Sequence, residues 1–230
     1  YGMAVARHTG NLPRQLRENY HGYPDCKREG NKRMEDDPVY LAAIKRFDQV
    51  IKDAQTLGLK EPTAVALATV SAEGRPSVRI VLMRGHDARG PVFYTNSQSR
   101  KGRELAANPQ AALCFYWDPA GLQVRIEGRV EPVEAQQSDL YWSTRPRESQ
   151  IAAWASQQSQ PMQDDAELKQ QFEAYQHEFS DQIITRPIHW YGYRLLPDRI
   201  EFWTSRPARL HERTLYERSP AGWTVARLQP

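Results

Sequence analysis

The sequence predicts a mainly β protein with peripheral helices, arranged as a barrel or a sandwich. Three observations support this prediction. Short β-type segments separated by tight turns begin near residue 63, one helix interrupts them, and strand patterns return at the chain's end. The expected strands, in chain order, are TAVALATV, PSVRIVLM, PVFYTN, AALCFYW, LQVRIEGRVEPV, WYGYRLLP, RIEFWTS, and two short runs near TLYER and WTVARL. GHDARG is expected to be a turn and SRKGRELAANP the inserted helix.

Helices are expected at three further places. Asp37 and Pro38 have the N-cap and first-turn residue types of a helix whose apolar face continues to Gly58. Two more helical stretches run over about 134–154 and 164–179. Residues 1–36 are polar and weakly periodic, so we expect a flexible N-terminal arm followed by a single domain over 37–230.

The charge balance argues against a nucleic-acid partner. Lys and Arg total 31 against 28 Asp and Glu, which gives a net charge of only +3. No apolar stretch approaches the roughly 20 residues of a membrane helix, and no signal-peptide core is present. Cys26 and Cys114 lie far apart without a CxxC motif. We therefore expect a cytoplasmic protein with neither a disulfide framework nor a membrane partner.

Several common catalytic motifs are missing. The sequence contains no GxGxxG after a strand, no GxxxxGK[ST], no HExxH and no GxSxG. The six histidines are scattered without metal-ligand spacing, so no metal is expected. Rossmann, P-loop, zinc-protease and serine-hydrolase interpretations are therefore poorly supported.

Arginines in RIVLMR and FYTNSQSRKGREL suggest a phosphate site. Strand alternation places Arg79, Val81 and Met83 on one face and Ile80, Leu82 and Arg84 on the other. Two strand-end arginines in solvent are the simpler interpretation of RIVLMR alone. Arg100 and Lys101 would open a helix after Ser99, where cations oppose the helix dipole unless an anion is bound. This second segment favours a phosphate.

Two later segments are also rich in donors. STRPRESQIAAWASQQS contains arginines, serines and glutamines, which suit a helix pair broken at Pro146 as well as a phosphorylated heteroaromatic ligand. In RPARLHER an extended backbone would place Arg209, His211 and Arg213 on one face. Glu212 leaves a neutralised surface open as an alternative. Three donors beside an aromatic residue favour an anionic aromatic ligand.

Together these segments resemble the pyridoxine (pyridoxamine) 5′-phosphate oxidase family. The matching pieces are RIVLMR, FYTNSQSRKGREL, LQVRIEGRVE, YWSTRPRESQIAAWASQQS, IEFWTSRPARLHER and the terminal W…RLQP, in the family's order across roughly 61–230, and LRENY near the start. The resemblance implies an FMN-binding split β-barrel homodimer with FMN at the subunit interface. It implies oxidation of pyridoxamine or pyridoxine 5′-phosphate to pyridoxal 5′-phosphate by O₂, with release of H₂O₂, in vitamin B6 biosynthesis and salvage.

The resemblance also implies site residues. FMN would be held by Arg79, Ile80, Val81, Leu82, Met83, Arg84, Tyr94, Thr95, Arg100, Lys101, Gln123, Gln158, Ser159, Trp203 and Arg213. The substrate would be held by Arg17, Tyr20, Arg84, Tyr141, Arg145, Ser149, Arg209, Leu210 and His211. Arg209 and His211 would lie against the pyridine ring as the catalytic pair. The family usually has Lys at the position of Arg84 and Gly at that of Ala152.

Two alternatives remain beside the oxidase. One is an FMN oxidase of the phenazine-biosynthesis type, in which we expect the substrate-phosphate residues to be absent. The presence of Tyr141, Arg145 and Ser149 argues against it. The other is a flavin- or pyridoxal-phosphate-binding carrier without turnover, which the same residues would serve equally well.

Overall fold

A computed structural model of the chain describes residues 34–230, which belong to one compact unit. The expected mainly β fold with peripheral helices is confirmed. All strand pairs are antiparallel, and the strands are β1 (Ala64–Val70), β2 (Pro76–Asp87), β3 (Gly90–Asn96), β4 (Gln110–Trp117), β5 (Leu122–Pro132), β6 (Trp190–Thr204), β7 (Glu212–Ser219) and β8 (Gly222–Leu228). None of the helices in this described part has the length and apolar character needed to cross a membrane.

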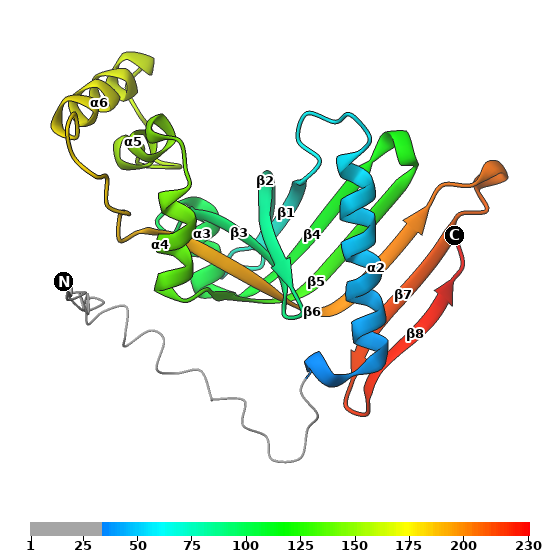
Figure 1. The fold of residues 1–230 in the computed structure, drawn as a ribbon. Coiled ribbons are helices and arrows are strands. Elements are labelled where there is room, and N and C mark those ends of the chain that lie inside the picture. Colours follow the sequence, from blue (N-terminus) through cyan, green and yellow to red (C-terminus); the bar gives the residue numbers. More distant parts are fainter. Residues whose placement is uncertain (1–33) are drawn as a thin grey trace, which may run out of the picture. The chain divides into compact units, whose positions relative to one another are not determined.

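Strand β6 closes the barrel. The sheet order is β3-β2-β1-β4-β5-β6-β7-β8, and an additional β3–β6 pairing joins the first six strands into a ring. On one edge of β6, residues 190–194 pair with β3 and residues 199–204 pair with β7, while the other edge pairs with β5. Figure 1 shows β6 running from the side of α4 (Ala135–Ser143) to the β7–β8 hairpin. The two strands predicted as WYGYRLLP and RIEFWTS are therefore one strand.

A close approach of backbones accompanies the bend in β6. The β5–β6 register shifts between Glu127 and Gly128. A Cβ atom on Gly128 would lie 2.0 Å from the carbonyl oxygen of Leu196, so only glycine fits at this position. Pro197 lies in the stretch of β6 that pairs with neither β3 nor β7. The backbone N–H that proline lacks is therefore not needed for hydrogen bonds to either strand.

Strand β2 is longer than predicted. The segment GHDARG was expected to be a turn, but β2 continues through Asp87 and the turn itself contains only Ala88 and Arg89. Gly90, with φ 123°, begins β3 directly afterwards. The extension is held by Arg194 of β6, which donates to Asp87 Oδ1 at 2.5 Å and to the Gly90 carbonyl at 2.9 Å.

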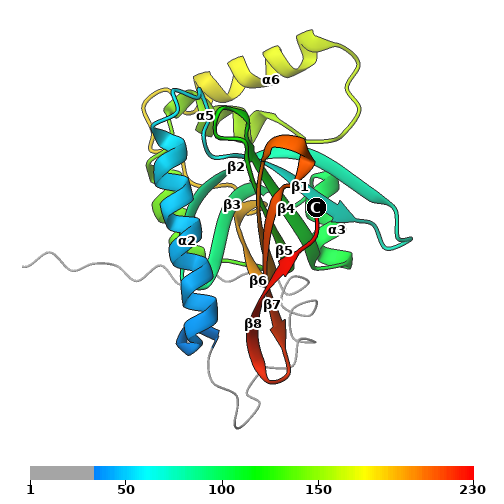
Figure 2. The same cartoon turned by 90° about the vertical axis from the view of Figure 1, so that its right-hand side faces the viewer.

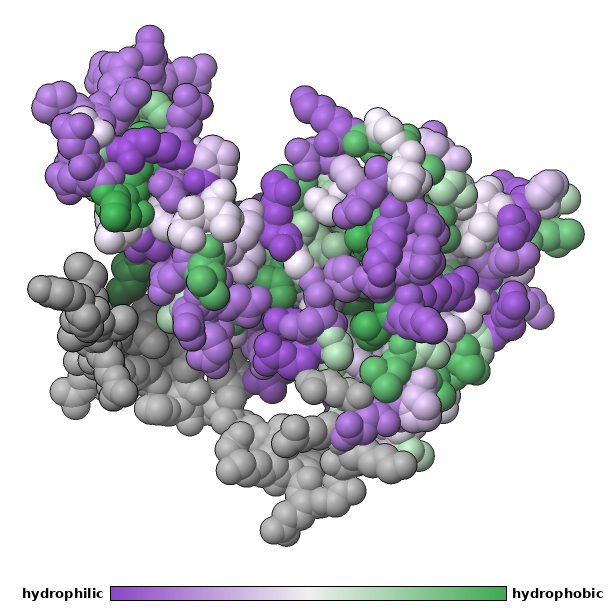
Figure 3. All heavy atoms as spheres, in the orientation of Figure 1, coloured by the Kyte–Doolittle hydropathy of each residue, from purple (hydrophilic) through white to green (hydrophobic). Residues whose placement is uncertain are grey.

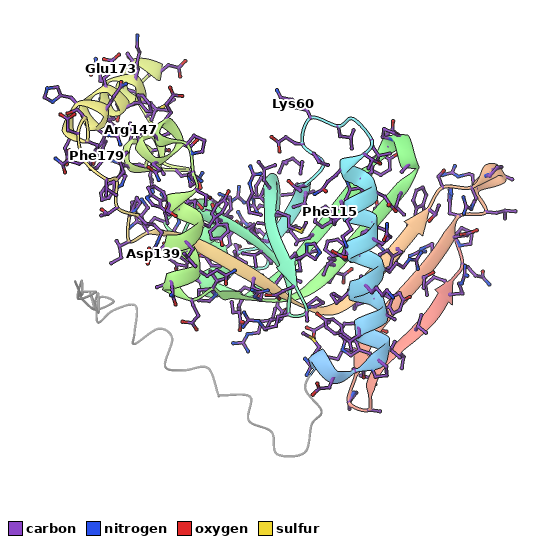
Figure 4. All side chains as sticks on the ribbon, in the orientation of Figure 1. Lys60, Phe115, Asp139, Arg147, Glu173 and Phe179 are labelled. Carbon is purple, nitrogen blue, oxygen red and sulfur yellow. The ribbon has the colours of Figure 1, made fainter. Side chains whose placement is uncertain are left out.

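Helix α2 (Pro38–Gln55) begins where the sequence predicts. Asp37 Oδ1 accepts from the backbone N–H groups of Val39 at 2.9 Å and Tyr40 at 3.2 Å, which caps the helix. Its apolar side chains recur three or four residues apart and bury one face against the barrel core, including Phe47 against Phe115 of β4 at 5.5 Å between ring centroids. Figure 2 shows α2 lying alongside the strands, and Figure 4 labels Phe115 where β4 passes beside it.

The remaining helices connect β-strands. The helix α3 (Arg100–Ala107) joins β3 to β4 as predicted. The helical stretch expected over 134–154 is a pair of helices, α4 and α5 (Arg147–Ala155), with the break at Pro146 that the sequence suggested, because proline disfavours helical geometry in the residue before it. The expected helix near 164–179 is α6 (Asp165–Glu178), which has no buried residue. Figure 3 shows mostly hydrophilic side chains over it.

A second apolar cluster holds α4, α5 and the end of α6 together. Its buried members are Trp142, Ile151, Phe179, Ile184 and Trp190. Arg147 of α5 strengthens the link by donating to the carbonyl oxygens of Phe179, Ser180 and Gln182, and Figure 4 labels Arg147 close to Phe179. Because of this cluster, the segment between β5 and β6 is a folded extension of the barrel.

Replacing Asp37 with Ala is expected to lower the free energy of unfolding by about 1–2 kcal/mol. The change removes the α2 cap and also the acceptor for the Trp223 backbone N–H, which donates to Asp37 Oδ2 at 3.0 Å. Urea unfolding followed by far-UV circular dichroism measures the difference. Asp36→Ala, which removes an exposed carboxylate one residue earlier, is the matched control. Equal losses in the two variants would contradict the assigned cap.

Candidate functional site

A cleft of about 560 Å³ opens beside β2, between β3, the start of α3, helix α4 and the loop after α5. It brings together most of the residues that the sequence singled out. Predicted site residues that line it are Arg79, Ile80, Val81, Leu82, Arg84, Tyr94, Thr95, Arg100, Lys101, Tyr141, Arg145, Gln158 and Ser159. Met83 is instead buried in the barrel core.

Arg79 is fixed by four hydrogen bonds. Burial along β2 alternates as predicted, with Arg79 and Met83 on the inward side and Ile80, 66% exposed, on the other. Arg79 Nη1 donates to the Leu67 carbonyl at 3.1 Å and to Thr69 Oγ1 at 2.5 Å. Its Nη2 donates to Ser77 Oγ of the same strand at 2.5 Å and to Glu104 Oε2 of α3 at 3.3 Å. The guanidinium is therefore held at the cleft before any ligand binds.

The acceptor at the centre of these contacts is Glu104 of α3. This buried carboxylate accepts from Ser77 Oγ at 2.6 Å, from Thr69 Oγ1 at 2.5 Å and from Arg100 Nε at 2.9 Å, besides Arg79. Burial by itself would raise the pKa of Glu104, but the hydrogen bonds from Ser77, Thr69 and Arg100 lower it to about 2. Glu104 is consequently ionised at every physiological pH.

Lys101 is a buried cation at the start of α3. Only 9% of the residue is exposed, and its Nζ donates to Gln158 Oε1 at 2.8 Å, Thr95 Oγ1 at 3.1 Å and Ser99 Oγ at 3.2 Å. These acceptors are neutral, and Lys101 forms no ion pair within residues 34–230. Burial, aided by the positive charge of Arg79, lowers the pKa of Lys101 to about 8. Glu104 is the negative charge that acts on Lys101 from a distance, and no carboxylate of residues 34–230 contacts its ammonium group directly, which favours binding of an anion there.

An aromatic stack forms another wall of the cleft. The Tyr94 and Tyr141 rings stack with centroids 4.0 Å apart, and Trp190 stacks on Tyr94 at 5.5 Å. The Arg145 guanidinium lies 4.6 Å from the Trp190 ring centroid and donates to the Ser149 carbonyl at 2.9 Å. Burial lowers the pKa of Arg145. Ser149 thus contributes its carbonyl oxygen to Arg145 and does not itself line the cleft.

The other predicted site residues form a second group, which we call the β5–β7 group: Gln123, Trp203, Arg209, Leu210, His211 and Arg213. Gln123, Trp203 and Arg213 are direct neighbours across β5, β6 and β7. The His211 ring lies 4.6 Å from that of Trp203, and Arg213 is already paired with the buried Glu201, with 2.8 Å between its Nε and Oε1. No member of the group lines the cleft. Arg17 and Tyr20 lie outside the described residues.

The extended backbone considered for residues 209–213 is only partly present. Residues Pro207–Arg209 form a 3₁₀ turn, and β7 begins only at Glu212. Ala208 and Arg209 have φ values of 55° and 61°, a left-handed conformation that costs energy for residues with side chains. Arg209, His211 and Arg213 therefore do not share one strand face. The turn leaves Arg209 and Leu210 exposed, and the Arg206 N–H donates to His211 Nδ1 at 3.2 Å.

Sequence reasoning missed Ser77 and Val78, which line the cleft. It also missed Thr69, Glu104 and Trp190, which contact residues that line it. Glu104 stands four residues after Arg100, a helical spacing that signals an ion pair and could have been noticed. Thr69 and Ser77 face each other across β1 and β2, and that contact depends on a register the sequence does not state. The β3–β6 pairing places Trp190 against Tyr94, which lines the cleft.

Comparisons with known proteins identify relatives over most of the chain. Residues 51–179 match the family described as pyridoxamine 5′-phosphate oxidase, and residues 190–230 match the pyridoxine 5′-phosphate oxidase C-terminal dimerisation region. A pyridoxine/pyridoxamine 5′-phosphate oxidase of Burkholderia cenocepacia is 52% identical over 188 residues, covering 80% of this chain and 87% of the relative. One of Sphingopyxis alaskensis is 49% identical, covering 86% and 89%.

Solved structures resemble the fold. PhzG from Burkholderia lata 383, in complex with tetrahydrophenazine-1-carboxylic acid, superposes with a TM-score of 0.76 at 34% identity, covering 88% of this chain and 98% of that one. A pyridoxamine 5′-phosphate oxidase-related, FMN-binding protein from Nostoc punctiforme has a TM-score of 0.65 at 18% identity, covering 81% and 96%. The second likeness concerns the fold alone.

The ligand-free protein is expected to become more stable as pH rises from about 8 to 10.5, by on the order of 1–3 kcal/mol from Lys101 alone. The lowered pKa means that the unfolded chain binds more protons than the folded one in this range. Raising the pH therefore favours the folded state. Urea unfolding across this pH range, compared between the wild type and Lys101→Met, isolates the contribution because other titrating groups cancel. Parallel pH profiles would contradict the burial of an unpaired ammonium group.

Proposed function

Because the chain belongs to the pyridoxine/pyridoxamine 5′-phosphate oxidase family, it is an FMN-dependent oxidoreductase of that activity, and we propose that its cleft binds both FMN and substrate. The reaction converts pyridoxamine or pyridoxine 5′-phosphate to pyridoxal 5′-phosphate. We propose O₂ as the final electron acceptor, with H₂O₂ and, from the amine, ammonia released. The observation that carries the assignment of the cleft is the buried, unpaired ammonium group of Lys101 beside Arg79 and Arg100.

The cleft residues suit the FMN phosphate. Arg79, Arg100 and Lys101 supply three positive charges and Glu104 one negative charge, so the local balance of +2 complements a phosphate dianion. Thr95 and Gln158, which now bind Lys101, are further polar contacts. Bound FMN supplies the two-electron acceptor that no amino-acid side chain provides. The protein contributes binding, orientation and exclusion of water.

The other end of the cleft suits a second phosphate. Arg84 and Arg145 are both cations there, and Tyr141 adds a hydroxyl group next to them. Arg145 is already oriented by Trp190 and by the Ser149 carbonyl, which lowers the conformational entropy lost on binding. We propose that these residues hold the substrate phosphate, with Arg84 acting where the family usually has Lys.

We further propose that a second copy of the chain completes the site. Trp203 of the β5–β7 group lies thirteen residues after Trp190 on β6, and Trp190 packs against Tyr94 and Arg145 of the cleft. The cleft and the β5–β7 group therefore lie toward opposite ends of this strand, which supports a ligand held between the cleft of one chain and the β5–β7 group of another. The dimerisation-region match covers residues 190–230, which include Trp203 and Arg213. In a homodimer, the partner's β5–β7 group would meet this cleft.

Exposed apolar residues support this arrangement. Val78 and Ile80 on the outer face of β2 are 68% and 66% exposed, and both line the cleft. Solvent-facing β-branched residues beside a ligand site favour burial by another chain. Within the completed site, Arg209 and His211 of the partner copy would orient the pyridine ring.

The location we propose is the cytosol. Cys26 and Cys114 stand far apart in the sequence, and Cys114 is a free, half-buried thiol on β4. Burial raises the pKa of Cys114, which favours an unreactive thiol.

The decisive experiment is aerobic turnover by FMN-reconstituted protein. Equal amounts of pyridoxal 5′-phosphate and H₂O₂ are expected from pyridoxamine 5′-phosphate, and at most weak turnover of unphosphorylated pyridoxamine, because Arg84 and Arg145 would have no phosphate to bind. Binding of FMN without either product would indicate a carrier. Equal affinity for both substrates would favour an oxidase related in specificity to PhzG.

Mixing two inactive variants is expected to restore activity if the site spans two chains. Lys101→Met damages the cleft and Trp203→Ala the β5–β7 group. When the two proteins are refolded together, about half of the dimers are mixed and each has one intact site, so about a quarter of wild-type activity should return. Lys101→Met mixed with Arg79→Ala is the matched control, because every site then contains a damaged cleft. Recovery in both mixtures, or in neither, would contradict a shared site.

A further inference from the structure

We infer that Glu104 is a positioning residue for phosphate recognition: it orients Arg79 and Arg100 through a hydrogen-bond relay and thereby favours FMN over riboflavin. The inference rests on the proposed function of the cleft. It extends that function to a residue that does not itself line the cleft and whose charge would repel a phosphate.

The position of Glu104 is unexpected on electrostatic grounds. A carboxylate near a phosphate site weakens anion binding unless it performs another task. Glu104 is 6% exposed, and its pKa of about 2 keeps it ionised. A buried charge of this kind is tolerated only when it is fully hydrogen-bonded. Here all of its partners belong to groups that approach the cleft from β1, β2 and α3.

The relay follows from the number of protons on each hydroxyl group. Thr69 and Ser77 each have one hydroxyl proton, and both donate it to Glu104 Oε2. Their oxygen lone pairs are then left to accept from Arg79, whose Nη1 reaches Thr69 and whose Nη2 reaches Ser77. The carboxylate therefore determines the direction of two hydroxyl groups, and these in turn hold the guanidinium.

The second oxygen of Glu104 holds the other arginine. Oε1 accepts from Arg100 Nε at 2.9 Å, across one turn of α3. The side chain of Arg100 is 60% exposed, so this contact is the main restraint on its direction. Arg100 opens the helix and lines the cleft, where an unrestrained side chain would lose more conformational freedom on binding a ligand.

Glutamine cannot accept hydrogen bonds from both the hydroxyl relay and Arg100, as Glu104 does. Glu104→Gln keeps the size of the side chain but turns one acceptor oxygen into an NH₂ donor. If the NH₂ group takes the place of Oε2, it faces three donors, from Thr69, Ser77 and Arg79. In the place of Oε1 it faces Arg100 Nε. Either orientation releases at least one arginine, although the variant gains a net positive charge that by itself would attract phosphate.

The test compares FMN with riboflavin, which lacks the phosphate, in fluorescence titrations of the full-length protein. Wild-type protein is expected to bind FMN much more tightly than riboflavin. In Glu104→Gln the preference for FMN should fall by about tenfold or more, while riboflavin affinity changes by no more than about twofold. Ser77→Ala, which removes one hydroxyl of the relay, should lower the preference in the same direction by a smaller factor and covers the case that Glu104→Gln does not fold.

Asp87→Asn is the control for a general loss of stability. It removes a carboxylate at the end of β2 that pairs with the buried Arg194 of β6 outside the cleft, so the preference for FMN should stay at the wild-type value. An unchanged preference in Glu104→Gln would overturn the inference. If Glu104→Gln lowered the affinities for FMN and riboflavin equally, Glu104 would have a structural role only. If the variant bound FMN more tightly, Glu104 would act only as a negative charge that opposes phosphate binding. A wild-type protein without any preference would instead overturn the proposed phosphate site.

Discussion

The pairing of β6 with two different neighbours along one edge is the constraint on which the rest of this structure depends. Residues 190–194 close the barrel against β3, and residues 199–204 carry β7 and β8 away from it. The same strand places Trp190 against Tyr94 of the cleft and Trp203 in the β5–β7 group. One continuous element therefore connects the two groups of residues that we propose to bind ligands.

The cleft itself depends on how charge is distributed among buried groups. The whole chain has a net charge of only +3, so a general basic surface cannot account for anion binding. The cations are instead concentrated at the β2–α3 corner, where Lys101 has only neutral partners and Arg79 is held by oxygen atoms of β1, β2 and α3. Such a site has its binding groups arranged before the ligand arrives, which reduces the reorganisation that binding requires.

Much of this could be predicted from local sequence. Alternation in RIVLMR correctly separated the two faces of β2, and Asp37 with Pro38 correctly marked the start of α2. Features that depend on partners far along the chain were missed. The strands expected as WYGYRLLP and RIEFWTS were separated after Pro197, yet this residue occupies the short stretch of β6 that pairs with neither β3 nor β7. The extended backbone considered for residues 209–213 does not extend to Arg209, because the chain turns through Ala208 and Arg209 in left-handed geometry.

In the candidate site too, residues in local motifs were predicted and residues that depend on distant partners were missed. Residues carried by long motifs, such as Tyr94, Arg100 and Lys101, lie together in the cleft. Residues whose role depends on strand register, such as Thr69 and Ser77, could not be identified from one sequence. The resemblance supplied a residue set that one chain does not bring together, because Gln123, Trp203 and Arg213 lie at the far end of β6.

The length of β6 has a consequence for the life of a newly synthesised chain. If the proposed two-chain site is formed from residues at opposite ends of β6, a chain on its own would be a folded but inert protein. Below the concentration at which dimers form, the amount of competent enzyme would grow with the square of the amount of chain. The cell would then obtain an oxidase, with the peroxide that it generates, only after enough protein had accumulated for encounters to be frequent.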